Sequence, residues 1–426
     1  MASGTTKRTE KVWASRRGAA KASSTGLIVG VIIAIVGISV GAYLYTQVPP
    51  TPPRATLIST SYVTSTAVSF NTITEVGGGA TQTVTQTVSG STVTQTQTQT
   101  SSATVTQTQT QTQSVQPIQT LKLATDPAGV AYDPTNGLTY VAFPNSSEIM
   151  AVNAQGGVVN TFSAPAGSLP TGVAVNPKTN MVYVTYNKGN NVTIIDATAG
   201  KIVTSVPVGV GPVGVTVNPA TNMVYVGSEN DDSVSVINGT TNTLIHGKNS
   251  TIADATFGVD NAYSLAIDPK TNLLYVGAVH GATRATTALT VVNASTTAFK
   301  IVGSYTIKGS QLTSLAYNSN TGLLYIANPQ QNVVNIFDTS KDAFVANVTA
   351  PHAYALVLDA RINRLLATDS ISNYFTSINT QTNSVVGTVP VGNDPLGIDL
   401  SPTTNLIYVS NSVDGSLTIL PDAVVP

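Results

Sequence analysis

One short pattern recurs seven times in the C-terminal part of this chain, and it constrains the fold more than any other feature. It reads AVNPKTNMVYVTY at residues 174–186, and a related form, DLSPTTNLIYVSN, occupies residues 399–411. A period of about 40 residues is typical of repeat architectures, in which each copy forms one supersecondary unit. The residues that set the register are Tyr140, Tyr183, Tyr225, Tyr275, Tyr325, Leu366 and Tyr408.

Each copy contains four short apolar runs separated by turn-forming residues. Within residues 172–206, for example, the turn-forming segment 176–180 separates the first two runs, and Asp196 follows the third. Runs this short and this rich in β-branched residues predict strands. Four strands in each of seven units predict an all-β fold, a seven-bladed β-propeller over residues 117–426.

The two ends of the repeat region predict how the ring is closed. The seventh unit stops after the run 416–420 and lacks a fourth strand, while a spare apolar run, residues 117–123, precedes the first unit. Closure of the ring would remove the exposed edges that uncharged strands otherwise present. We therefore expect residues 117–123 to complete the seventh blade.

The repeated element resembles a known family of repeats. A Tyr-Val-(Thr/Gly/Ser/Ala) element after Pro-x-Thr-Asn, as at residues 177–185, is similar to the YVTN family of β-propeller repeats. This resemblance implies a surface-layer-associated or extracytoplasmic protein of an archaeal or bacterial type, with no settled activity. The sixth copy departs from the pattern, since residues 359–363 replace the usual turn and Leu366 replaces the tyrosine.

The N-terminal residues predict a membrane anchor. Residues 1–25 hold six Lys and Arg against one Glu, and residues 26–45 carry no charge. Twenty uncharged residues in a helix would cover about 30 Å, the hydrocarbon thickness of a bilayer. The positive-inside rule places the basic tail in the cytoplasm. We therefore predict a single-pass protein of the cell membrane, with a cytoplasmic tail (1–25), a transmembrane helix (26–46) and an extracellular remainder.

A polar segment separates this anchor from the repeats. Residues 47–116 begin with four prolines and continue almost entirely in Thr, Gln, Ser and Val. Few of these side chains are large and apolar, so burial cannot offset the loss of chain entropy on folding. Thr- and Ser-rich tracts often act as O-glycosylated spacers. The sequence predicts a disordered stalk that lifts the propeller from the membrane.

Two short N-terminal motifs leave other interpretations open. Arg16 and Arg17 loosely resemble a twin-arginine export signal. The pair Lys21-Ala22 before an apolar helix resembles the processing site of archaeal pilin-like proteins, in which the helix packs in a filament core. A mature chain that begins near Ser23 would favour such a filament subunit.

Composition excludes several classes of function. The chain has no cysteine and three histidines, which removes thiolate metal sites, iron–sulfur clusters and cysteine nucleophiles. A net charge of −1 argues against a nucleic-acid partner, which requires a basic face. Hydrolase and nucleotide-binding motifs are absent, so no cofactor is expected. The alternative to a binding protein is an extracytoplasmic enzyme similar to propeller lactonases.

The two longest repeats predict where a ligand would bind. Their extra residues fall near 249–261 and 280–286, which belong to a blade connection and to a hairpin between the second and third strands. Both kinds of segment lie on the same face of a propeller, and loops on a rigid scaffold often bind ligands. Acidic side chains gather there, and calcium is the ion that their hard oxygen atoms favour. The candidate calcium ligands are Glu229, Asp231, Asp232, Asp254 and Asp260.

Three further residues are candidates for the same face. His280 and Arg284 lie in the longer hairpin, and His352 lies in the connection that leads to the sixth blade. Acid–base chemistry would require such groups to gather in one pocket. Asp369 with Arg361 and Arg364 is a second possible set, although surface ion pairs are the simpler interpretation of those three residues.

Six sequons suggest a glycosylated surface protein, because Asn-x-Ser/Thr is the acceptor sequence in exported chains. They begin at Asn145, Asn191, Asn238, Asn249, Asn293 and Asn347. Together these features predict a membrane-anchored protein that displays a propeller for binding or adhesion. Its expected partners are the membrane, through residues 26–46, and an envelope glycan, a surface-layer protein or another cell-surface protein.

Overall fold

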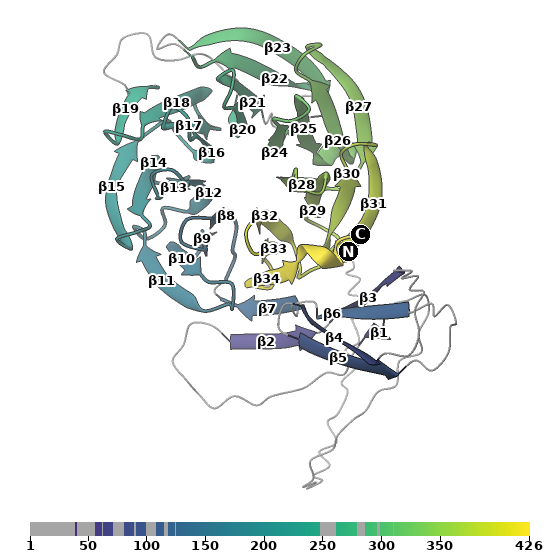
Figure 1. The fold of residues 1–426 in the computed structure, drawn as a ribbon. Helices are drawn as coiled ribbons and strands as arrows, with labels where there is room; N and C mark the ends of the chain where they lie inside the picture. Colours follow the sequence, from purple (N-terminus) through teal and green to yellow (C-terminus); the bar gives the residue numbers. More distant parts are fainter. Residues whose placement is uncertain are drawn as a thin grey trace, which may run out of the picture. The chain divides into compact units, whose positions relative to one another are not determined.

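Seven antiparallel sheets are arranged around a common axis (Figure 1); six have four strands, and the sheet of the seventh blade has a fifth strand, β2, paired with its outer strand. The computed structural model describes residues 118–123, 125–247, 261–278, 286–295, 299–309 and 311–426, together with short strands between residues 39 and 114. In each sheet the strand order follows the chain from the inner edge outward, except in the seventh. The predicted seven-bladed β-propeller is confirmed.

The first four blades contain strands of four to nine residues. Blade 1 comprises β8 (Val130–Asp133), β9 (Leu138–Phe143), β10 (Glu148–Val152) and β11 (Val158–Ser163). Blade 2 comprises β12 (Pro170–Asn176), β13 (Met181–Tyr186), β14 (Asn191–Asp196) and β15 (Lys201–Pro207). Blade 3 comprises β16 (Pro212–Asn218), β17 (Met223–Ser228), β18 (Ser233–Asn238) and β19 (Thr243–His246). Blade 4 comprises β20 (Ala262–Asp268), β21 (Leu273–Ala278), β22 (Thr286–Asn293) and β23 (Lys300–Lys308).

The remaining blades follow the same plan, with two short 3-10 helices. Blade 5 comprises β24 (Ser314–Asn318), β25 (Leu323–Asn328), η1 (Pro329–Gln331), β26 (Val333–Asp338) and β27 (Ala343–Thr349). Blade 6 comprises β28 (Ala353–Asp359), β29 (Arg364–Asp369), β30 (Tyr374–Asn379) and β31 (Ser384–Pro390). Blade 7 comprises β32 (Pro395–Ser401), β33 (Leu406–Asn411), β34 (Ser416–Pro421) and β7 (Ile118–Lys122), and η2 (Asp422–Val424) follows β34.

The turn between the first two strands of a blade explains the Asn-Pro-x-Thr-Asn signature. In blade 2 the backbone N–H of Lys178 donates to Oδ1 of Asn176 over 3.0 Å, which forms an Asx turn. The turn ends at Asn180, whose φ of 55° lies in the left-handed region that Asn tolerates. Blade 6 keeps this geometry despite its different sequence, since the N–H of Arg361 donates to Oδ1 of Asp359 over 3.0 Å.

The repeated tyrosines form the core between neighbouring blades. Six of the seven register positions are tyrosines, each at most 1% exposed, and Leu366 replaces the ring in blade 6 at 2% exposure. Burial raises the pKa of Tyr183 and of Tyr225 to about 12, so these phenols stay neutral in the folded protein. Each tyrosine packs with apolar side chains of its own blade and an adjacent one, as Tyr183 does with Val217 and Val224 of blade 3.

The ring is closed by the N-terminal strand, as the sequence predicts. Strand β7 pairs antiparallel with β34, and Leu121 lies opposite Leu417. Leu121 is 3% exposed and belongs to the cluster that joins blades 7 and 1. The seventh blade therefore combines strands from both ends of the repeat region, which fastens the last blade to the first.

Six further strands lie N-terminal to β7: β1 (Ser39–Val40), β2 (Thr56–Ser61), β3 (Val63–Phe70), β4 (Thr81–Val88), β5 (Ser91–Thr98) and β6 (Thr108–Ser114). The other residues before 118 lie outside the described part of the chain, so the cytoplasmic tail, the membrane helix and the disordered stalk stay predictions. Within the described residues, no helix has the length and apolar character needed to span a membrane.

Candidate functional site

The two faces of the propeller carry different segments. One face, which we call the connection face, carries the hairpins between the second and third strands and the connections between blades. The opposite face, the turn face, carries the other two hairpins of each blade. On the connection face, His352 has a φ of 49°, and Leu169 and Asp394 have similar values in the equivalent connections before β12 and β32. This conformation costs a non-glycine residue about 1–2 kcal/mol, so the surrounding contacts must hold it.

A hollow of about 390 Å³ opens on the connection face between blades 5 and 6. This volume lies within the range of small-molecule sites. Two blade connections, η1 and the residues after β29 surround the hollow. Its lining consists of Gln311, Pro329, Gln330, His352, Tyr354, Ser370 and Ile371.

A buried carboxylate lies behind the histidine of this hollow. Nδ1 of His352 lies 3.3 Å from Oδ1 of Asp369, and the aspartate side chain is 1% exposed. The backbone N–H groups of Ile371 and Ser372 each donate to the same oxygen over 3.0 Å, which fixes the carboxylate. Nδ1 is buried beside this carboxylate without forming a hydrogen bond, so Nε2 of His352 is the nitrogen available to a ligand. The equivalent residues in the other blades are Phe143, Tyr186, Ser228, Ala278, Asn328 and Asn411.

A second side chain of the hollow, Tyr354, contacts a residue two blades away. The hydroxyl of Tyr354, on β28, lies 2.9 Å from the hydroxyl of Tyr263, on β20 of blade 4. Burial raises the pKa of both phenols, and the charge of Glu229 adds to the rise in each. Both hydroxyls therefore remain protonated hydrogen-bonding groups, and their contact fixes the ring of Tyr354 in the lining of the hollow.

The backbone around His352 is fixed by the neighbouring hairpin. Asn332, which follows η1, accepts a hydrogen bond at Oδ1 from the N–H of His352 over 3.1 Å. Its carbonyl accepts a second bond from the N–H of Ala350 over 3.0 Å. The short 3-10 helix of blade 5 therefore holds the connection that carries His352, and the hollow is preformed.

Three of the candidate calcium ligands are described, and their carboxylates mainly accept hydrogen bonds that hold loops in place. Oε1 of Glu229 accepts a hydrogen bond from the Asn187 amide over 3.0 Å. Asp231 accepts bonds from the N–H of Val210 and the hydroxyl of Ser233, and Oδ1 of Asp232 accepts one from the N–H of Asn261. Among the described residues, no three acidic or histidine side chains are grouped to hold a metal ion.

Four of the predicted site residues cannot be compared with this geometry. Asp254, Asp260, His280 and Arg284 lie outside the described residues. Calcium binding therefore stays a prediction, and a rise in melting temperature with calcium that a chelator reverses would support it.

The interpretation of Asp369 as part of a surface ion pair is wrong. Asp369 is buried on the connection face beside His352, whereas Arg361 lies in a hairpin of the turn face. The guanidinium of Arg361 contacts Asp359 at 2.6 Å and Asp422 at 3.3 Å.

Sequence reasoning identified His352 but missed Tyr354 and Tyr263. The sequence could have indicated Asp369, because it is the one acidic residue at the end of the second strand of a blade.

The described sequons lie at different places on the propeller. Asn145 is exposed in the blade 1 hairpin of the connection face, and Asn347 is exposed on the outer strand β27. Asn191 begins β14, and its amide donates to the carbonyl of Gly189. Asn238 and Asn293 form Asx turns on the turn face, and Asn249 lies outside the described residues. Glycosylation at these six positions stays a prediction.

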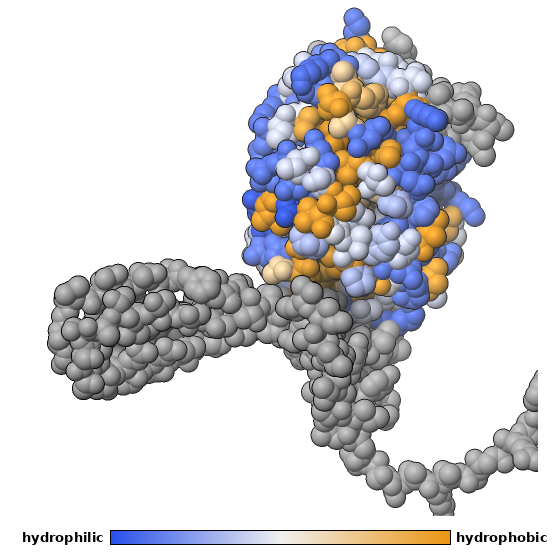
Figure 2. Space-filling view, turned by 90° about the vertical axis from the view of Figure 1, so that its right-hand side faces the viewer, coloured by the Kyte–Doolittle hydropathy of each residue, from blue (hydrophilic) through white to orange (hydrophobic). Residues whose placement is uncertain are grey.

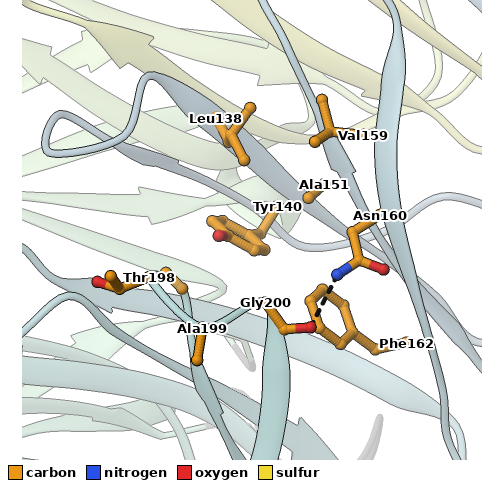
Figure 3. Close-up of a pocket in the computed structure, with 10 residues that line it drawn as sticks. Leu138, Tyr140, Ala151, Val159, Asn160, Phe162, Thr198, Ala199 and Gly200 are labelled. Atoms are coloured by element: carbon orange, nitrogen blue, oxygen red, sulfur yellow. Dashed lines mark hydrogen bonds between the residues drawn. The ribbon is translucent and has the colours of Figure 1, made fainter.

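A smaller hollow of about 220 Å³ lies between blades 1 and 2 (Figure 3). Tyr140 and Phe162 contribute rings to its lining, and the amide of Asn160 donates to the carbonyl of Gly200 over 2.9 Å. This hydrogen bond joins the outer strand of blade 1 to the hairpin of blade 2. The hollow lacks the histidine and paired amides of the first one, and we interpret it as a packing feature.

The comparisons define the class of this protein. No model of a known family matches the chain, and no curated protein matches its sequence. Among solved structures, a chain of hydrazine synthase from Kuenenia stuttgartiensis is similar, with a TM-score of 0.63 and 15% identity over 71% of this chain and 97% of that chain. At this identity the likeness shows the fold alone. Fold and comparison together define a seven-bladed β-propeller protein.

Proposed function

We propose that this chain is a membrane-anchored cell-surface protein that displays its propeller to bind an envelope component. The observation that carries this proposal is the preformed hollow between blades 5 and 6, on the face predicted for binding. A rigid scaffold with fixed polar and aromatic side chains in one concave site is the usual arrangement of a binding module. The apolar run 26–45 and the Thr- and Gln-rich segment 47–116 support a position outside the membrane.

The resemblance to YVTN repeats supports the same proposal. Tyr183-Val184-Thr185 carries the first three residues of the motif, and related elements occur in the other blades. A surface-layer-associated or extracytoplasmic location would suit a chain with six sequons and no cysteine. The partner would then be an envelope glycan or a neighbouring surface protein.

Protease treatment of intact cells tests the location. We expect trypsin to release the propeller from intact cells and to spare an epitope tag before Ala2 until the cells are lysed. Binding of the purified full chain to isolated envelopes tests the function. Protection of the propeller in intact cells would refute surface display. An N-terminus near Ser23 in the mature protein would favour the pilin-like alternative instead.

The pair His352 and Asp369 supports a second candidate function, an extracytoplasmic hydrolase. A histidine oriented by a buried carboxylate is a common general base, and the two groups lie 3.3 Å apart in a hollow. Lactones and esters are the substrates to test, because the predicted enzyme alternative resembles propeller lactonases. Hydrolysis that is lost in the His352→Asn variant would support this candidate, and its absence with intact envelope binding would exclude it for those substrates.

A further inference from the structure

The chemistry of the hollow between blades 5 and 6 indicates what kind of ligand fits it. Two primary amides (Gln311 and Gln330) and the hydroxyl of Ser370 are part of its lining. An amide offers a donor and an acceptor side by side, and a hydroxyl offers both. These groups complement a ligand that carries several neighbouring hydroxyls.

The same hollow also has an apolar side. Tyr354, Pro329 and Ile371 contribute to the lining, and Ile371 is 68% exposed. An exposed isoleucine of this size at a concave site offers apolar surface to a ligand. A sugar ring has one face of C–H groups and a rim of hydroxyls, and so requires both kinds of contact.

The charges around the hollow disfavour an ionic ligand. Its seven lining residues include neither lysine nor arginine, so an anion would find no paired cation there. Glu229 and Asp394 lie close enough to raise the pKa of Tyr354, which is unfavourable for an anion. A cation would find no carboxylate in the lining, because Asp369 lies behind His352 and its side chain is 1% exposed.

We propose that this hollow binds one neutral sugar unit of an envelope glycan, with Tyr354 against the ring face and Gln311, Gln330 and Ser370 on its hydroxyls. Nε2 of His352 meets a further hydroxyl, and Asp369 is a positioning residue that orients the imidazole. This inference rests on the proposed binding function and assigns its ligand class. The hydrogen bond between the hydroxyls of Tyr354 and Tyr263 holds the aromatic ring of Tyr354 in place before binding, which reduces the entropic cost of binding the sugar.

Saturation-transfer NMR with the purified full chain tests the ligand class. The probes are the methyl glycosides of glucose, galactose and mannose, with glucuronic acid and glucosamine as charged counterparts. We expect at least one neutral glycoside to bind, and the charged counterparts to bind more weakly. Binding restricted to a charged sugar would overturn the proposal.

Four variants test the site, with one matched control. Gln311→Ala and Tyr354→Ala should each weaken binding of the neutral glycoside about tenfold, which corresponds to the loss of about one hydrogen bond or ring contact. Asp369→Asn keeps an oxygen acceptor for the N–H groups of Ile371 and Ser372, and should weaken binding less than His352→Asn. Asn160→Ala, in the smaller hollow of the turn face, should leave binding unchanged.

The outcomes separate this inference from the proposed function. Equal binding of the glycoside by the chain and the Gln311→Ala variant, each with an unaltered circular dichroism spectrum, would overturn the inference. Envelope binding without any glycoside binding would also overturn it, and would leave the proposed function standing. Failure of the full chain to bind envelopes at all would refute the proposed function itself.

Discussion

At the scale of single residues, a hydroxyl at one repeat position ties blades 2, 6 and 7 to the blade that follows each of them. Thr185, two residues after the repeated tyrosine, donates to the carbonyl of Val213 in blade 3 over 2.8 Å. In blade 4 this position is Gly277, and Ser264 of the inner strand donates instead to the carbonyl of Leu312 over 2.6 Å. In blade 4 the adjacent inner strand therefore supplies the hydroxyl that Gly277 lacks.

Removal of such a hydroxyl should destabilise the ring. Ser410 accepts a bond from the N–H of Gly397 over 2.8 Å and donates to the carbonyl of Ala128 over 2.6 Å, across the seam between blades 7 and 1. Ser410→Ala leaves both backbone groups unpaired, so the free energy of unfolding should fall by about 1–3 kcal/mol. Thr382→Ala, on an exposed hairpin, should change it by less than about 0.5 kcal/mol. Equal urea midpoints for the two variants would contradict this account.

A carboxyl at the same seam should make stability depend on pH. Oδ2 of Asp399 accepts a bond from the N–H of Tyr132 in blade 1 over 2.7 Å, and burial raises the pKa of Asp399 from 3.8 to about 6. Between these two values the folded chain holds the proton more tightly than the unfolded chain. Stability should therefore fall as pH rises from about 4 to 6, by at most about 3 kcal/mol.

The Asp399→Asn variant isolates this contribution. Urea unfolding at pH 4 and pH 7 should show a larger loss of stability between the two values in the wild-type chain than in the variant. Parallel profiles would show that the carboxyl titrates as in the unfolded chain. The sequence could not indicate this group, because the equivalent residue in blade 2 is Ala174 and the repeat predicts no acid there.

At the scale of elements, the inner strands require small residues where they meet. A Cβ on Gly172 of β12 would lie 2.2 Å from the carbonyl oxygen of Val213 on β16, and Gly129 is equally close to the carbonyl oxygen of Thr171. Gly172→Ala must push two inner strands apart, so we expect a loss of about 3 kcal/mol or more. Gly167→Ala meets no atom within 4 Å and should cost only the strain of its φ of 74°, about 1 kcal/mol. Similar thermal midpoints for both variants would contradict this packing argument.

The outer strands show what a repeat pattern does not predict. Blades 1 to 6 each have a β-bulge near the start of the outer strand, as at Val203, Val302 and Val345. These valines are 44%, 52% and 45% exposed, and the outer rim of the ring shows hydrophobic residues scattered among polar ones (Figure 2). Alternation and β-branching predict that these strands exist, but the extra residue depends on strand twist at an edge. Bulges at an outer edge also hinder pairing with another sheet.

At the scale of the whole molecule, the sequence predicts the ring more fully than the site. Seven copies, the missing last strand and the spare run 117–123 specify the number of blades and the closure. The site depends on contacts between distant residues, such as Tyr263 with Tyr354 and His352 with Asp369. No spacing in the sequence brings these pairs together, because the propeller geometry alone places them on one face.

Closure by strand β7 leads to the last prediction. Thr120 of β7 lies opposite Thr418 of β34, and the chain has no cysteine that could interfere with an added disulfide. Directly opposed residues in an antiparallel pair have the spacing that a disulfide requires. A Thr120→Cys, Thr418→Cys pair would close nearly the whole ring, so the loop-entropy model predicts a stabilisation of about 6 kcal/mol.

A local disulfide provides the matched control for this test. Thr376 and Thr388 lie opposite each other in β30 and β31, and their disulfide would close a short loop worth about 3 kcal/mol. Guanidinium unfolding of both oxidised variants, each against its reduced form, should therefore show the larger gain for the pair that joins β7 to β34. If β7 left the ring before the rest unfolded, its disulfide would stabilise the chain more than the local one and would also abolish early proteolysis near residue 124. Equal gains in the free energy of unfolding, with unchanged proteolysis, would mean that the stability of the ring does not depend on the pairing of β7 with β34.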